Sequence, residues 1–379
     1  MGMEKKYFIT TYGCQLNVHE SEKLAGILRS NGYTESGCLE EADVVIFNTC
    51  AIRGNAENRA LGNIGALKKW KRSNPNKILA ICGCMTQQPQ NAEYIKKTFP
   101  FVDIIFGTAN LHKFGEFLQN RLNGNKNKVF LSEDFTLEGE NIEMYRTSGE
   151  NAWVNIMQGC NNFCSYCIVP YVRGRERSRK KADILKEIEE IVKTKQYKTI
   201  TLLGQNVNSY GNDTNECNFA QLLKEICQID GDFKVSFMTS HPKDFSSEVI
   251  DIIANNNKML KEIHLPVQSG SNDILKAMNR NYTVEKYLNI IDEIKAKIPS
   301  VKISTDIIVG FPGETEEDFL ATCELLKKVK YNNVFAFIYS KREGTPAALM
   351  ENQVPSEIKH QRVNKVLAIA KEFKEDNNE

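Results

Sequence analysis

The first 120 residues alternate short β-rich runs with amphipathic helical stretches. Runs of β-branched and aromatic residues predict strands at 7–11, 44–47, 78–81 and 102–106, and helical spacing predicts helices at 21–28 and 55–70. Strands separated by helices are typical of a parallel sheet with helices on its faces. We therefore expect an α/β domain of the flavodoxin or Rossmann kind.

From residue 151 the pattern becomes six repeats of a strand followed by a helix. The helical stripe Ile184, Ile188, Ile191 and Val192 has the spacing of a face that packs on a core. Six such units predict a partial (β/α)6 barrel of the TIM type, whose active site lies at the carboxyl ends of the strands. The predicted strands are 153–157, 199–203, 234–238, 262–265, 302–309 and 333–339.

Residues 120–150 are rich in Asn, Gly, Lys and Glu and contain few apolar positions. They predict a boundary between domains, with a first domain at 1–122, a linker at 123–145 and a second domain at 146–376. The chain ends in a predicted charged helix at 358–375.

The composition favours a globular protein of the reducing cytoplasm. Among 379 residues, 41% are hydrophobic, the net charge is +1, and neither a secretory signal nor a membrane-length apolar run is present. Nucleic-acid binding would therefore depend on a local basic patch. In such a compartment the eleven cysteines are better explained as metal ligands than as disulfides.

Three of these cysteines, Cys160, Cys164 and Cys167, lie in one C-x3-C-x2-C loop directly after a predicted strand. A four-iron cluster normally has four cysteine ligands. Three local thiols would leave one iron open, as catalytic metal sites do. A zinc site usually needs four protein ligands, a disulfide framework suits short secreted chains, and buried structural cysteines rarely occur three to a loop.

This motif resembles the hallmark of the radical S-adenosylmethionine (SAM) superfamily. The resemblance implies that the amino and carboxylate groups of SAM chelate the open iron. It places Gly204 and Gln205 at the SAM amino group, and Tyr166 with Asp306 to Gly310 at the adenine. It also implies SAM or substrate contacts for Ser240, Gln268 and Arg280.

In the first domain, Cys14, Cys50 and Cys84 each follow a predicted strand. The carboxyl ends of parallel strands meet at one edge of a sheet, where ligands bind, so these distant thiols are expected to gather. Cys82 competes for the role but is predicted to lie within its strand. The remaining cysteines, Cys38, Cys217, Cys227 and Cys323, are interpreted as small apolar residues.

The blocks Y-G-C-Q-L-N at 12–17, N-T-C-A-I-R at 48–53 and G-C-M-T-Q at 83–87 resemble the N-terminal domain of the methylthiotransferases, a branch of the radical SAM enzymes. The resemblance implies a second [4Fe-4S] cluster on Cys14, Cys50 and Cys84.

Polar side chains follow five other predicted barrel strands. Turns are polar in general, so each is weak evidence alone, but five strand ends at one face with hydrogen-bonding side chains favour a binding site there. Thr315 and Asp318 are explained by helix capping, and His241 and His264 by a structural role.

The segment 173–179 places arginine at alternate positions. If it is extended, Arg173, Arg175, Arg177 and Arg179 lie on one side, next to Lys180 and Lys181. A solvated charge run is one explanation, and a contact with an RNA backbone is the other. The RNA substrates of the resembled family favour the second.

Gln15-Leu16 after the first cysteine is nearest to the branch that modifies N6-dimethylallyladenosine in tRNA. The resemblance then implies methylthio transfer from SAM and a sulfur donor to carbon 2 of that base, next to the anticodon, by a 5′-deoxyadenosyl radical mechanism. It implies a tRNA anticodon stem-loop as substrate, flavodoxin or ferredoxin as electron donor, and a monomer.

Two alternatives stay open: the threonylcarbamoyladenosine or ribosomal-protein branch, and a non-catalytic iron–sulfur electron carrier or RNA-binding protein. One departure from the family pattern is the expected absence of its C-terminal RNA-binding TRAM domain. It indicates either truncation or tRNA binding without that domain, and weaker tRNA affinity.

Overall fold

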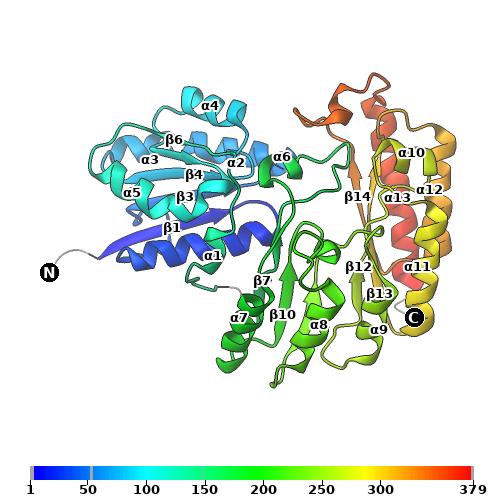
Figure 1. The fold of residues 1–379 in the computed structure, drawn as a ribbon. Coiled ribbons are helices and arrows are strands. Elements are labelled where there is room, and N and C mark those ends of the chain that lie inside the picture. The colour runs from blue at the N-terminus through cyan, green and yellow to red at the C-terminus, as the bar shows by residue number, and fades with distance from the viewer. Residues whose placement is uncertain (1–3, 52–53, 148, 377–379) are drawn as a thin grey trace. The chain divides into compact units, whose positions relative to one another are not determined.

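The computed structural model describes residues 4–51, 54–147 and 149–376. The chain divides into two compact units, which are described separately (Figure 1). The first comprises Met1–Gly149 and Ile168–Arg175, and the second comprises Glu150–Cys167 and Glu176–Glu379. Among the described residues, no helix combines the length and the apolar character needed to cross a bilayer.

The first unit contains, among its described residues, a sheet of six parallel strands in the order β2-β1-β3-β4-β5-β6. This is the strand order of flavodoxin-like sheets, extended by one strand, so the predicted fold class is confirmed. The strands are β1 (Lys5–Thr11), β2 (Tyr33–Glu35), β3 (Val44–Thr49), β4 (Ile78–Gly83), β5 (Ile104–Phe106) and β6 (Val129–Phe130).

Both faces of this sheet are covered, which explains the continuous apolar runs of β3 and β4. Val44 and Ile46 belong to one buried cluster, whereas Val45 and Phe47 belong to the other. The helices are α1 (Gln15–Ser30), α2 (Gly54–Ala66), α3 (Lys68–Ser73), α4 (Pro89–Thr98), α5 (Phe114–Leu122) and α6 (Val169–Arg173), with 3₁₀ helices η1 (Thr108–Lys113) and η2 (Glu138–Asn141).

Part of the predicted linker packs along α1. Lys23 forms a buried ion pair with Glu140 at 2.8 Å, and the Tyr145 amide donates to the Glu22 carbonyl at 3.0 Å. Gly26 allows this approach, because a Cβ there would lie 1.8 Å from the Glu143 carbonyl oxygen.

The second unit contains, in its described part, six main strands that run parallel in chain order. Two three-stranded groups, β7-β10-β11 and β12-β13-β14, are joined by a bridge between Val235 and Met259. The predicted partial barrel is therefore confirmed. These strands are β7 (Asn151–Asn155), β10 (Thr199–Leu203), β11 (Lys234–Phe237), β12 (Glu262–His264), β13 (Lys302–Val309) and β14 (Asn333–Ile338), with a short antiparallel pair β8 (Met157–Gln158) and β9 (Arg177–Ser178).

Helices cover one face of these strands; α11, α12 and α13 lie beside β12–β14 (Figure 1). The predicted stripe on α7 is confirmed, since Ile184, Ile188 and Ile191 are buried. The helices are α7 (Lys181–Lys193), α8 (Phe219–Gln228), α9 (Ser247–Asn255), α10 (Asn272–Ala277), α11 (Val284–Lys297), α12 (Glu316–Val329) and α13 (Ser356–Asp376), with 3₁₀ helices η3 (Val207–Ser209) and η4 (Pro346–Leu349).

The predicted row of four arginines does not form, and that expectation was wrong. Arg173 ends α6 and is buried against Glu20, and Gly174, with φ of 73°, turns the backbone. Arg179 is buried and pairs with Glu187 at 2.7 Å. An alternating pattern gives a one-sided row only where the backbone is extended throughout.

Candidate active site

Cys14, Cys50 and Cys84 follow three strands that are neighbours in the first sheet. Cys14 is the N-cap of α1 directly after β1, Cys50 follows β3, and Cys84 follows β4. Since β1, β3 and β4 are parallel and adjacent, the three cysteines share the carboxyl edge of the sheet. Ile52 and Arg53 of the second sequence block lie outside the described residues.

Close contacts bring these three segments together. A Cβ on Gly13 would lie 3.0 Å from the Cys50 Sγ, and the Cys84 amide donates to the Thr49 carbonyl at 3.0 Å. Asn17 connects two of the segments: its Nδ2 donates to Thr49 O at 3.0 Å, while its Oδ1 lies 3.4 Å from the Cys14 thiol, which donates to it. These contacts bring the three cysteine segments together at one edge of the sheet.

Cys84 lies in an apolar cluster with Ala51, Ile168 and Val172. Burial raises the pKa of Cys84 to about 12, whereas the positive charge of Arg173 acts in the opposite direction. Cys82 lies within β4 and is also buried. A metal bound here would have to displace the Cys84 proton, with the guanidinium favouring the resulting thiolate.

The loop of Cys160, Cys164 and Cys167 is held by backbone contacts of the second unit. The Ser165 amide donates to Met278 O at 3.0 Å, and its hydroxyl donates to Ala277 O at 2.8 Å. Cys160 and Cys164 are buried and Cys167 is half-buried. Burial raises the pKa of Cys160 to about 11.

Asn279 holds the same loop from the end of α10. Its Nδ2 donates to the carbonyls of Asn162 and Phe163, both at 3.0 Å. Phe163 has a φ of 47°, a left-handed conformation that a non-glycine residue adopts only when its surroundings hold it. Lys243 donates to Asn162 Oδ1 at 2.7 Å, so the turn between the first two cysteines is fixed on two sides.

Arg280 is buried next to this loop. Its Nη1 lies 3.6 Å from Cys164 Sγ and 3.5 Å from the Tyr166 hydroxyl. Its other nitrogens donate to the Pro266 carbonyl at 2.8 Å and the Tyr282 hydroxyl at 2.9 Å. Each cysteine set therefore has a buried guanidinium close to it.

Buried side-chain atoms without a described hydrogen-bond partner occur at three of the predicted SAM positions. They are both amide atoms of Gln205, the Ser240 hydroxyl and the Gln268 Oε1; His241 Nε2 is a further one. Buried polar atoms are normally paired, so unpaired ones at strand ends indicate a polar ligand.

Two further predicted positions are places of close backbone approach. A Cβ on Gly204 would lie 2.7 Å from Met157 Cγ. The Asp306 carbonyl accepts from the Gln268 amide at 2.9 Å, and the Asp306 carboxylate lies 3.5 Å from His264 Nε2.

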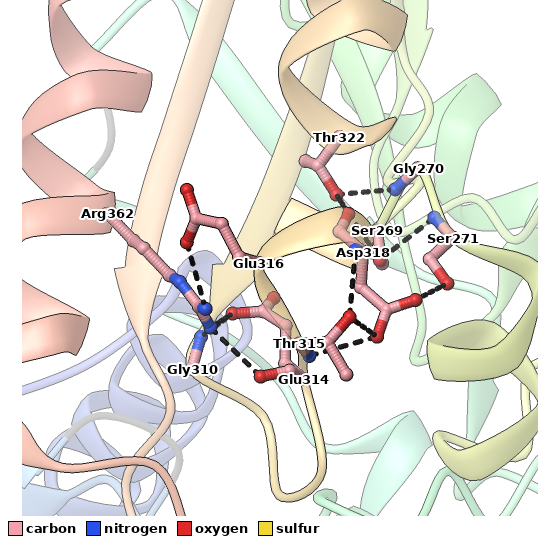
Figure 2. A network of polar contacts seen from close by, with 10 residues as sticks. All are labelled: Ser269, Gly270, Ser271, Gly310, Glu314, Thr315, Glu316, Asp318, Thr322 and Arg362. Carbon is pink, nitrogen blue, oxygen red and sulfur yellow. Dashed lines mark hydrogen bonds and ion pairs between the residues drawn. The ribbon is translucent and has the colours of Figure 1, made fainter. Parts of the chain in front are cut away.

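The turn after β13 is fixed by a buried ion pair from α13. The Gly310 amide donates to Glu314 Oε2 at 2.6 Å, and Arg362 Nη1 donates to the same oxygen at 2.6 Å (Figure 2). Arg362 also reaches Glu316 at 3.3 Å. The Gly310 N–H is thus already engaged, which leaves other backbone atoms of the turn to contact a ligand.

The rest of this network caps α12. Thr315 and Asp318 form the predicted capping box, and the Ser271 hydroxyl donates to Asp318 (Figure 2). The Gly270 amide donates to Thr322 Oγ1 at 2.9 Å. These contacts tie the loop after β12 to the N-terminal half of α12, the helix that follows β13.

Among the described residues, no three His, Cys, Asp or Glu side chains are placed to share one metal ion. An iron–sulfur cluster differs, because its thiolates bind separate irons. Each set consists of three buried or half-buried thiols, the number of protein ligands that leaves one iron of a four-iron cluster open.

Sequence reasoning missed the residues that hold the site. In the sequence, Lys243 lies 81 positions from the residue that it contacts, Asn279 lies 117 positions away and Arg362 lies 48 positions away. Only Asn279 had a local signal in the sequence, because asparagine is common just after the end of a helix; its φ of 58° agrees with that position.

Two family models match the chain: the radical SAM superfamily over residues 154–326, and the uncharacterized protein family UPF0004 over residues 6–107. Several curated relatives are called tRNA-2-methylthio-N(6)-dimethylallyladenosine synthase. That of Clostridium perfringens strain SM101 is 56% identical over 369 residues, 96% of this chain and 82% of the relative. That of Clostridium tetani is 54% identical, covering 98% and 82%.

Solved structures support the fold. The radical S-adenosylmethionine methyltransferase TsrM from Kitasatospora setae matches with a TM-score of 0.67 at 12% identity, over 92% of this chain and 74% of that one. The cobalamin-dependent radical enzyme OxsB matches with a TM-score of 0.61 at 13% identity, over 97% and 56%. The chain therefore belongs to the radical SAM superfamily and, within it, to the family of the tRNA-2-methylthio-N(6)-dimethylallyladenosine synthases.

Proposed function

We propose that this chain transfers a methylthio group to carbon 2 of N6-dimethylallyladenosine beside the anticodon of tRNA. The observation that carries the proposal is the presence of two separate sets of three thiols at carboxyl edges of parallel strands. An electron carrier needs no second open set, whereas transfer of sulfur to an unactivated carbon needs a radical source and a sulfur source.

Members of the radical SAM superfamily use SAM and a [4Fe-4S] cluster, and Cys160, Cys164 and Cys167 would hold that cluster. When bound, it supplies the electron that cleaves SAM reductively. Gln205, Ser240 and Gln268 offer unpaired polar atoms to orient SAM. Arg280, which is buried, lies beside the loop and reaches the Tyr166 hydroxyl.

Cys14, Cys50 and Cys84 would hold a second cluster that presents sulfur to the substrate. Arg173 would favour the thiolate form of Cys84 when a cluster binds, and Asn17 fixes the Cys14 segment against Thr49. A reduced flavodoxin or ferredoxin would supply the electron, in the cytoplasm, where tRNA is available.

The test compares two variants, Cys164→Ala and Cys50→Ala, incubated anaerobically with SAM, a reductant and tRNA that carries N6-dimethylallyladenosine. We expect Cys164→Ala to form no 5′-deoxyadenosine. Cys50→Ala should form 5′-deoxyadenosine without methylthiolated tRNA. Normal product from Cys50→Ala would show that the second thiol set takes no part in the reaction. A wild type that holds iron but neither binds nor cleaves SAM would favour the electron-carrier alternative.

A further inference from the structure

The two faces of β14 differ in what covers them. Val334, Ala336 and Ile338 pack against the main core of the second unit. The alternate residues Phe335 and Phe337 are 50% and 39% exposed. Single exposed apolar side chains are ordinary, but two phenyl rings in succession on one face of a strand form an apolar surface without a described cover.

This surface continues across the neighbouring strands. Phe335 is in register with Asp306 and Phe337 with Ile308, and both partners are half-buried on the same face. The His264 ring meets Phe335 edge to face, with centroids 5.9 Å apart. We call Phe335, Phe337, His264, Asp306 and Ile308 the aromatic strip.

The aromatic strip leads to the cysteine loop. Ile308 packs in the same apolar cluster as Tyr166, which lies between Cys164 and Cys167. A group lying on the two phenyl rings would therefore be near the place where SAM is proposed to bind.

The side chains of the aromatic strip favour an unpaired base as ligand. Exposed aromatic faces stack on unpaired bases, and every base offers a π face. The Asp306 carboxylate would repel a phosphate, and together with His264 it offers polar side-chain atoms to the edge of a base. The resemblance assigns only backbone atoms of residues 306–310 to the adenine of SAM. The apolar ring surface also suits a branched hydrocarbon substituent.

We propose that Phe335 and Phe337 bind the unstacked adenine of the substrate RNA together with its N6-dimethylallyl group, and so determine the preference for the alkylated base. This inference rests on the proposed function and deepens it. It assigns to β14 the recognition of the base, in contrast to the contacts that orient SAM.

The test uses the holoenzyme and two anticodon stem-loop RNAs, one with N6-dimethylallyladenosine and one with adenosine. Phe335→Ala and Phe337→Ala should each weaken binding of the alkylated RNA about tenfold, and reduce the discrimination between the two RNAs. Phe335→Tyr and Phe337→Tyr should restore most of the affinity, because the stacking face is kept. Leu367→Ala, at a 48% exposed position on α13, is the matched control and should change nothing.

Two readouts separate this role from others. SAM affinity and RNA-independent formation of 5′-deoxyadenosine should stay at wild-type values in all these variants. An equal loss of SAM affinity would assign the strip to the cofactor adenine and overturn the inference. If the wild type makes product and both alanine variants bind RNA as well as it does, the role of the aromatic strip is overturned and the proposed function stands. If the wild type makes no product and binds both RNAs equally, the proposed function is overturned too.

Discussion

The guanidinium of Arg173 and the carboxylate of Glu20 form a doubly hydrogen-bonded, buried ion pair, with Nη1–Oε1 at 2.6 Å and Nη2–Oε2 at 3.1 Å. The pair fixes α6 against α1 in the first unit. Within the pair, Arg173 lowers the pKa of Cys84 and Glu20 raises it, and burial has the largest effect.

Replacing Glu20 by Leu should destabilise the first unit by about 3–5 kcal/mol, because Arg173 would be left buried without a carboxylate. The double variant Glu20→Leu, Arg173→Met should recover most of that loss. Urea unfolding of the metal-free protein measures both free energies. Equal stability of the single and double variants would contradict a buried pair.

Substituting Gly83 should disturb the N-terminal thiol set more than substituting Gly32. Both glycines have positive φ, but a Cβ on Gly83 would lie 2.2 Å from Thr49 O, whereas none of the described atoms lies within 4 Å of a Cβ on Gly32. We expect Gly83→Ala to lower iron incorporation several-fold and Gly32→Ala to leave it unchanged. The measurement is iron per chain in a background with Cys160, Cys164 and Cys167 replaced by alanine.

Asn279→Gly should weaken SAM binding, because two hydrogen bonds to the cysteine loop are lost at about 1 kcal/mol each. Asn281→Gly is the matched control, since Asn281 has a similar φ of 54° and its side chain donates, among the described residues, to Asn279 O at 3.4 Å rather than to the cysteine loop. Equilibrium SAM binding to the reconstituted protein should separate the two variants about tenfold or more. The same affinity in both would show that the loop does not need Asn279.

His241 should make the stability of the second unit depend on pH. Burial, and then the charges of Arg280, Lys243 and Lys286, lower the pKa of His241 from 6.5 to about 2. Below pH 6.5 the unfolded chain binds a proton that the folded chain does not, so the free energy of unfolding falls as pH falls, by about 1.4 kcal/mol per unit. Unfolding of wild type and His241→Gln between pH 7.5 and 5.5 should reveal this difference in slope.

Long apolar runs made much of the fold predictable. The strands at 44–47 and 78–81 are covered on both faces, and the period of α7 marks a single buried stripe. The short strands β2 and β6 were not predicted, because two or three residues are too few to show the alternation of buried and exposed positions that marks a strand. They lie at the two edges of the sheet, where pairing with one neighbour is decided by tertiary contacts.

The thiols of the candidate site were predictable for two different reasons. Cys160, Cys164 and Cys167 are recognised by spacing, whereas Cys14, Cys50 and Cys84 required the topology of a parallel sheet. The residues that hold the neighbouring loops in place were not predictable, since Arg362, which pairs with Glu314, belongs to a helix that is distant in the chain. The arginine run failed for a local reason, the turn at Gly174.

The two thiol sets also imply an order of assembly. The C-x3-C-x2-C loop carries its ligands within eight residues, so a partly folded chain already holds them near one another. The other set exists only after β1, β3 and β4 have aligned side by side. Any cluster on the N-terminal set would therefore form only after its sheet has folded, whereas the three loop thiols are near one another in the chain before that.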